Sequence, residues 1–276
     1  MHKKKFLLCW GLITLALLAG ALLVPASGGG EAIQPAMRDA VLHSEGRIDL
    51  FGLKDVNPAF ISAMAVSGTL LLAAALIRLL VIPRFTLVPG RFQLLLETLV
   101  DTFDGLARGN SPHRNKFLGA YIFSAGVYIF VGTLFELFGF QAVAVTGASV
   151  ALPAPLSDVN AAISLGVLSY LVILSGGIAG NGLRGVGMTL KDFSLPLSMS
   201  FRLFGALLSG LLVTELVYHY IALSFVLPVI VGVLFTLLHA LIQAYVLTML
   251  TSLFYGEVSA PHPKKVSKKT SATQTA

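Results

Sequence analysis

Residues 195–223 read LPLSMSFRLFGALLSGLLVTELVYHYIAL, an apolar run long enough to cross a lipid bilayer, with one arginine, Arg202, inside it. An arginine in hydrocarbon costs from about 2.5 to more than 10 kcal/mol. It therefore persists only where a partner carboxylate, a water-filled cavity or a function keeps it there. The run predicts a membrane protein, and Arg202 is its first candidate functional residue.

The composition of the whole chain agrees with this. Of its 276 residues, 56% are apolar and 12% are charged, against about 25% charged residues in soluble domains. The net charge is +6, but the basic residues stand at the edges of apolar runs, so we expect no nucleic-acid partner. The only cysteine, Cys9, lies in an apolar run, so there is no thiolate metal site and we expect neither metal nor cofactor.

The N-terminal residues 1–27 have a basic head, an apolar core and then small residues, which is typical of a signal peptide cleaved near Ala26 or Ser27. The apolar core is long for a signal peptide, so an extra, uncleaved N-terminal span is the alternative. Residues 28–57 are polar and form the predicted extracytoplasmic segment.

Five apolar runs after this segment predict an all-α integral membrane protein. The membrane domain covers residues 58–255, and a basic cytoplasmic tail covers 256–276. The predicted transmembrane helices are residues 58–82, 117–138, 159–180, 195–220 and 224–255. The last two are long and joined by a short loop, so we expect a tilted antiparallel hairpin.

Lysine and arginine set the predicted orientation. They are frequent in residues 83–116, in residues 181–194 and in the tail, and absent from the loops at 139–158 and 219–224. By the positive-inside rule the C-terminus is cytoplasmic, which fits a multi-pass protein of the bacterial inner membrane. In residues 91–108 the apolar side chains fall on one side of a helix and the charged side chains on the other. This predicts an amphipathic helix on the cytoplasmic leaflet.

Small residues share the helix face of Arg202. Gly205, Ala206 and Ser209 follow it by three, four and seven residues. Such a face lets another helix come close, either as static packing inside one bundle or as a surface for a moving partner. A permanently paired, structural Arg202 is the alternative to a functional one.

The counter-charge of Arg202 is not evident in this chain. Within the predicted spans the only acids are Glu136 and Glu215, both near outer ends. Glu215 is thirteen residues from Arg202, about 20 Å along a helix and on another face. We therefore expect the partner carboxylate in another chain, unless Glu136 folds inward.

The last span carries a polar stripe of Thr236, His239 and Gln243 at i, i+3 and i+7. In an antiparallel hairpin Gln243 comes near the depth of Arg202. A single histidine in a span is often a core residue, but in this stripe His239 fits the lining of a hydrated path.

Further polar residues gather on the outer side. Glu136 ends the second span, and Asp158 with Asn160 begins the third. Together with Glu215 they predict an acidic, protonatable outer mouth. For Asp158, a helix N-cap is an equally good interpretation.

Four segments resemble subunit a of the F-type ATP synthase. They are VPGRFQLLLETLV at 88–100, PLSDVN at 155–160, FRLFG at 201–205 and ALIQAYVLTMLTSLFY at 240–255. An arginine followed by Leu-Phe-Gly, with a glutamine in an Ile-Gln-Ala-Tyr context some forty residues later, is a specific combination. The resemblance covers nearly the whole chain after the leader.

The resemblance implies a stator ion channel facing a rotating ring of c subunits, with the b subunits of the peripheral stalk and the rest of the F1Fo complex as partners. It implies that Arg202 makes each ring carboxylate release its ion and blocks a leak between two offset half-channels. Gln243 would position Arg202. The remaining residues would line the ion path: Glu215, His239, Glu136, Asp158, Asn160, Ser209 and Thr236.

The chain departs from the family pattern at three positions. Ala206 stands where the family usually has asparagine, Leu211 where an acid is common, and Thr236 where a histidine is common. Glu215 and His239, each one turn away, are the candidates that replace the missing groups. The coupling ion, proton or sodium, stays open.

Other functions fit the sequence less well. A secondary transporter or channel acting alone, with Arg202 binding an anionic substrate, predicts internal repeats that the sequence lacks. A structural scaffold leaves Arg202 without a counter-charge. An enzyme would need a nucleophile, metal cluster or phosphate loop, and none is evident.

Overall fold

The computed structural model describes residues 15, 48–50, 53–143, 149–219 and 227–261. The predicted signal segment and most of the N-terminal segment and tail lie outside this part of the chain. Short antiparallel hairpins and 3-10 turns accompany the helices: β1 (Ile48–Leu50) with β2 (Leu53–Val56), β3 (Gln141–Val143) with β4 (Ser149–Ala151), η3 (Glu136–Phe138) and η4 (Pro155–Ser157). The helices are α3 (Pro58–Leu76), continued by η1 (Ile77–Val81) and η2 (Ile82–Arg84), α4 (Arg91–Asn110), α5 (Asn115–Phe135), α6 (Val159–Asn181), α7 (Leu183–Lys191), α8 (Ser194–His219) and α9 (Leu227–Ser259).

Each predicted helix is present, with boundaries shifted by a few residues. Among the described residues, four helices are long and apolar enough to cross a membrane: Pro58–Arg84, Asn115–Phe138, Val159–Asn181 and Gly232–Ser259. α8 is a continuous helix of 26 residues at the fifth predicted position, and its crossing of the membrane stays a prediction. The chain is therefore a multi-pass helical membrane protein, and the count of five stays open.

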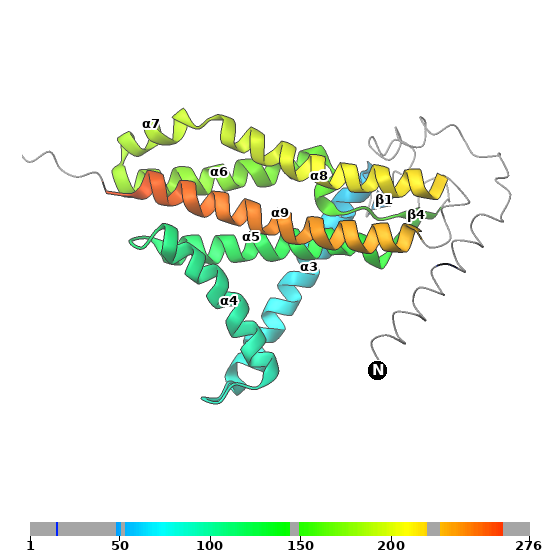
Figure 1. Cartoon of the computed structure of the whole chain (residues 1–276), viewed down its shortest axis with the longest axis horizontal. Coiled ribbons are helices and arrows are strands. Elements are labelled where there is room, and N and C mark those ends of the chain that lie inside the picture. Colours follow the sequence, from blue (N-terminus) through cyan, green and yellow to red (C-terminus); the bar gives the residue numbers. More distant parts are fainter. Residues whose placement is uncertain (1–14, 16–47, 51–52, 144–148, 220–226, 262–276) are drawn as a thin grey trace, which may run out of the picture.

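α5, α6, α8 and α9 form an elongated bundle (Figure 1). α8 and α9 run side by side in opposite directions, as the short loop between them predicted. The core is built from aliphatic side chains of all four helices, including the fully buried Ile122, Ile129, Ile173 and Leu203. Because α9 packs on α5 and α6 as well as α8, its inward face sets the position of every other bundle helix.

The far end of α9 is capped by side chains from two other elements. Asn181, at the end of α6, donates through Nδ2 to the backbone oxygens of Val258 and Ala260, both at 2.9 Å. His113, between α4 and α5, places Nε2 at 2.8 Å from the Ser259 oxygen. Helix C-termini leave carbonyls without partners, so these contacts complete α9 and tie it to its neighbours.

α7 was not predicted as a helix. It packs back on α6 where two glycines meet, since a Cβ at Gly185 would lie 2.0 Å from the Gly177 oxygen. Only this close approach of two backbones lets so short a helix bury one side, and the sequence pattern of residues 183–191 alone does not reveal it.

α3 and α4 leave the bundle and meet at a bend, forming a V (Figure 1). We call residues 67–102, which make up this V, the arm. The buried residues of α3 all lie in its first turns: Pro58, Ala59, Ser62 and Val66. The arm is therefore joined to the bundle at the start of α3, before the chain turns outward.

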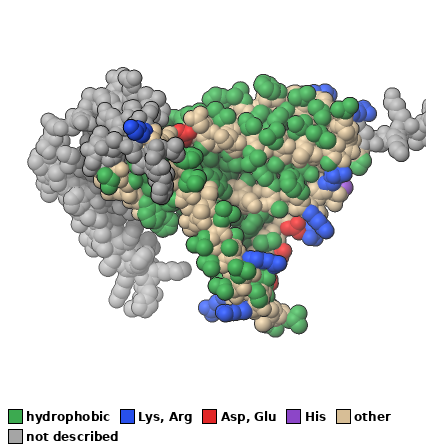
Figure 2. Space-filling view, turned by 180° about the vertical axis from the view of Figure 1, so that it is seen from behind, with side chains coloured by type: hydrophobic (Ala, Val, Ile, Leu, Met, Phe, Trp, Pro, Cys, Tyr) green, Lys and Arg blue, Asp and Glu red, His purple; other side chains and the backbone are tan. Residues whose placement is uncertain are grey.

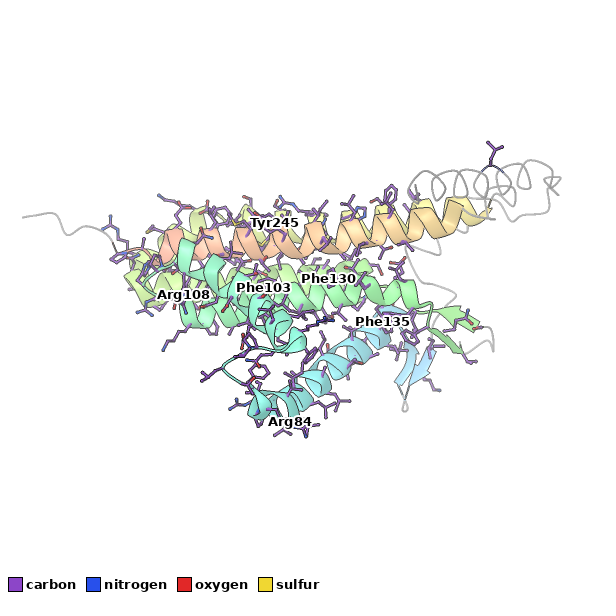
Figure 3. All side chains as sticks on the ribbon, turned by 60° about the horizontal axis from the view of Figure 1, so that its bottom comes forward. Arg84, Phe103, Arg108, Phe130, Phe135 and Tyr245 are labelled. Atoms are coloured by element: carbon purple, nitrogen blue, oxygen red, sulfur yellow. The ribbon has the colours of Figure 1, made fainter. Side chains whose placement is uncertain are left out.

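The second attachment of the arm is the end of α4. The Phe103 ring packs edge-on against Phe123 of α5, with centroids 5.6 Å apart, and Ala107 is fully buried. Figure 3 shows Phe103 close to α5, Arg84 near the tip of the arm and Arg108 where α4 reaches the bundle. α4 confirms the predicted helix at 91–108, while its place on the cytoplasmic leaflet stays a prediction.

The surface is divided by chemistry. Figure 2 shows hydrophobic side chains over most of the bundle flank, with lysines and arginines at the α7 end and on the arm. This separation suits a flank in lipid and a basic end in water, as the positive-inside prediction requires.

Candidate functional site

Arg202 lies on the outside of the bundle. Its neighbours Leu203 and Leu207 are buried, while Phe201, Arg202 and Gly205 are exposed. α8 therefore packs one face inward and turns the arginine outward. Between described residues, the one ion pair joins Arg108 and Asp104 on α4, at 2.6 Å, so Arg202 has no described counter-charge.

The surface beside Arg202 is smooth. Ser209 is exposed and donates through Oγ to the Ala206 oxygen at 2.8 Å, so its hydroxyl is folded onto its own helix. A Cβ added at Gly205 would meet nothing within 4 Å. Gly205, Ser209 and the half-buried Ala206 thus form the surface of small side chains that the spacing predicted. We call these three residues the smooth strip.

Gln243 lies next to Arg202, as the hairpin predicted. Its side chain is 6% exposed, and it shares with Arg202 a cavity of about 10 Å³. That is close to the smallest volume that holds one water molecule. The remaining lining is apolar: Met199, Leu203, Val246, Leu247 and Leu250. Neither Arg202 nor Gln243 hydrogen-bonds to another described side chain, so both keep their donors available toward this cavity and the outer face.

The other two residues of the polar stripe continue outward along α9. His239 is half-buried, and its Nδ1 lies 2.8 Å from the Phe235 backbone oxygen. A carbonyl only accepts, so Nδ1 carries a hydrogen and Nε2 is the nitrogen that can take up a proton. The ring also stacks on Phe235, with centroids 5.8 Å apart. Thr236 is half-buried, about 10 Å along the helix from Gln243.

Asp158 is a helix N-cap, which confirms that interpretation. Its Oδ1 accepts from the backbone N–H groups of Asn160 at 2.7 Å and Ala161 at 3.2 Å. Its Oδ2 accepts from Asn57 Nδ2 at 2.7 Å. Asn57 was not predicted as a cap, although an asparagine directly before a proline and an apolar span is itself a helix-start signal.

For the remaining predicted residues the structure gives a position in the fold. Glu136 begins η3 and is half-buried. The Asn160 side chain is exposed at the start of α6. Glu215 belongs to α8, but its side chain lies outside the described part of the chain. The structure thus brings Gln243 to Arg202 and Asp158 to Asn160, and shows no contact between these two pairs.

Among the described residues there is no group of three histidine, cysteine, aspartate or glutamate side chains that could hold a metal ion. The chemistry that Arg202 offers is electrostatic, because its guanidinium is always charged. A fixed cation on a smooth face, with a buried amide beside it, can attract, hold and release an anionic group that reaches it from outside.

Comparison with known proteins identifies this arrangement. The chain is similar to ATP synthase subunit a of Histophilus somni (strain 129Pt), with 26% identity over 205 residues that cover 60% of this chain and 76% of the relative. The family model described as ATP synthase A chain matches residues 61–256, from the first turn of α3 to the last turn of α9. Because this match takes in Arg202, Gln243 and well over half of the sequence, the chain belongs to the ATP synthase A chain family.

Proposed function

We propose that this chain is the stator ion channel of its ATP synthase, with two offset half-channels that carry protons, or sodium ions, to and from carboxylates on the c-subunit ring. Family membership makes it a subunit of the membrane motor. The observation that carries the finer proposal is Arg202, exposed on a smooth helix face without a described counter-charge and backed by Gln243.

Arg202 is the group that makes each ring carboxylate release its ion. Its guanidinium is always charged, so it favours the ionised form of any carboxylate that approaches it. In a low-dielectric setting this attraction is far stronger than in water, which makes an arriving carboxylate release its ion. The same charge repels a cation that would pass directly from one half-channel to the other.

The smooth strip explains how the ring moves on. Gly205, Ala206 and Ser209 add little bulk beside the arginine, so ring helices can approach and slide past. The strip serves as the c-ring face of this subunit.

Gln243 supports Arg202 between encounters. Its amide oxygen can accept from the guanidinium, directly or through one water in the shared cavity. The arginine thereby keeps a polar neighbour in the interval when no ring carboxylate is beside it.

The outer half-channel runs along the outward parts of α8 and α9. His239, with Nε2 available for a proton, and Thr236 form one side, and Glu215 is the acid of the other. Glu136, Asp158 and Asn160 stand at the mouth. Glu215 and His239 take the places of the acid and histidine that the family usually has at neighbouring positions.

The position in the cell follows from charge. The basic α7 end and the tail face the cytoplasm, in a bacterial inner membrane, and the arm is the surface offered to the b subunits of the peripheral stalk. A stand-alone transporter is disfavoured, because it predicts internal repeats that the sequence lacks.

The test is to replace Arg202 by Ala or by Lys. We expect both variants to assemble and to lose ion-driven ATP synthesis in membrane vesicles, since lysine is a point charge whose protonation can shift. Arg184→Ala removes an exposed arginine from α7, outside the arm and the site, and should leave synthesis unchanged. Synthesis at the normal rate in the Arg202→Ala complex would overturn the proposal.

A further inference from the structure

Helix α3 contacts the bundle through its first turns only. The buried residues of α3 lie within Pro58–Val66, after which the helix runs outward as part of the arm. Whatever fixes the start of α3 therefore fixes the direction in which the whole helix leaves.

The start of α3 packs on a buried turn. η4 and the residue before it carry Ala154, Leu156 and Ser157, all at most 5% exposed. This turn contacts α3, α5, α6 and α8, so four helices meet on it. On the α5 side, a Cβ at Gly132 would lie 3.6 Å from the Pro155 ring, an ordinary packing distance.

Two helix caps are joined directly beside this turn. Asn57 accepts through Oδ1 from the Ala59 N–H at 2.9 Å and so caps α3. Its other side-chain atom, Nδ2, donates to Asp158 Oδ2 at 2.7 Å, and Asp158 caps α6 through Oδ1. The two residues are 101 positions apart, so this bond is tertiary and ties one helix start to another.

The Asp158 carboxylate is fully engaged. Three N–H groups donate to its two oxygens, from Asn57, Asn160 and Ala161. The ionised carboxylate accepts all three of these bonds, which hold its two oxygens toward two different helix starts. A group that carries protons must gain and lose them repeatedly, whereas a carboxylate in this position is needed in one form.

We propose that Asn57 and Asp158 form a latch that positions α3 against η4 and α6, and that Asp158 serves this latch instead of carrying the transported ion. Asn57 is thus a positioning residue for the outer mouth. The transport part of this inference rests on the proposed ion-channel function. The latch itself is measured by the thermal midpoint for loss of this subunit from the complex, which does not depend on that function.

The experiment uses the assembled ATP synthase with four test variants and one control variant. Asn57→Ser and Asp158→Ser each keep a capping hydroxyl but cannot span the gap to the other residue. Asp158→Asn leaves two amides facing each other. The reciprocal swap, Asn57→Asp with Asp158→Asn, can remake all four hydrogen bonds with the charge on the other helix. Ser164→Ala is the control, because this exposed hydroxyl bonds only within α6, to the Asn160 backbone oxygen.

We expect each single variant to lower the thermal midpoint by about 3 to 10 °C, and the swap to regain at least half of that loss. ATP synthesis should follow the midpoint, so the swap should restore it although position 158 no longer carries a charge. If a single variant fails to assemble, the thermal midpoint and the ATP synthesis of the swap still test the inference.

Two results would overturn the inference. A wild-type midpoint in Asn57→Ser would mean that the bond between the caps does not hold α3. A swap that is as stable as the wild type yet inactive across the whole pH range would mean that the Asp158 carboxylate itself carries the ion.

Discussion

The substitution Gly205→Leu changes the surface of this subunit beside Arg202 without touching its packed core. Gly205 lies in the middle of α8 beside Arg202, and a Cβ there would meet nothing within 4 Å. A side chain at position 205 therefore leaves the helix into open space in the isolated subunit. Since glycine costs about 1 kcal/mol in a helix interior relative to alanine or leucine, the substitution should stabilise α8 by up to about 1 kcal/mol.

The expected effect on the motor has the opposite sign. If the c ring passes over this strip, a leucine overpacks the contact at each step, which typically costs about 1 to 3 kcal/mol. Added to the barrier for rotation, that cost slows ion-driven ATP synthesis by about fivefold to 150-fold.

The assay compares ATP synthesis in vesicles with the thermal midpoint of the assembled complex. Gly105→Leu is the matched control, because Gly105 is an exposed glycine of α4 with nothing within 4 Å of its Cβ position. We expect both variants to keep or raise the midpoint and only Gly205→Leu to lose synthesis. Wild-type synthesis in Gly205→Leu would refute the assignment of this strip to the ring.

Two other substitutions test the site and the bundle. Gln243→Leu should reduce synthesis while the complex still assembles, since it removes the amide beside Arg202 from a lining that is otherwise apolar; an unchanged rate in vesicles would exclude a supporting role. Asn181→Leu removes the donor to two backbone oxygens at the end of α9 and should destabilise the subunit by about 1 to 3 kcal/mol, seen as a lower midpoint, whereas Asn160→Ala should leave it unchanged.

The position of Gln243 beside Arg202 could be predicted because it depends on local rules. Helical spacing fixed the side of the helix on which each residue lies, and a short outer loop made the two helices antiparallel neighbours. The N-cap role of Asp158 is equally local, since it depends on two residues that follow within three positions.

The latch could not be predicted in the same way. Asn57 could be recognised as a helix start, but its partner is 101 residues away, and nothing in either segment indicates which helix starts meet. The buried polar face of α9 was missed for a related reason. Thr248, Thr251 and Ser252 are fully buried, yet in an apolar sequence they resemble incidental small residues until the packing of α5 and α6 is known.

The two attachments of the arm have a mechanical consequence. α3 is held at η4 and α4 is held at Phe103 and Ala107, so the arm and the bundle together close a triangle. A triangle cannot shear unless one of its sides stretches or one of its corners opens. A pull on the tip of the arm, in the plane of this triangle, is therefore expected to load η4 and α5 first.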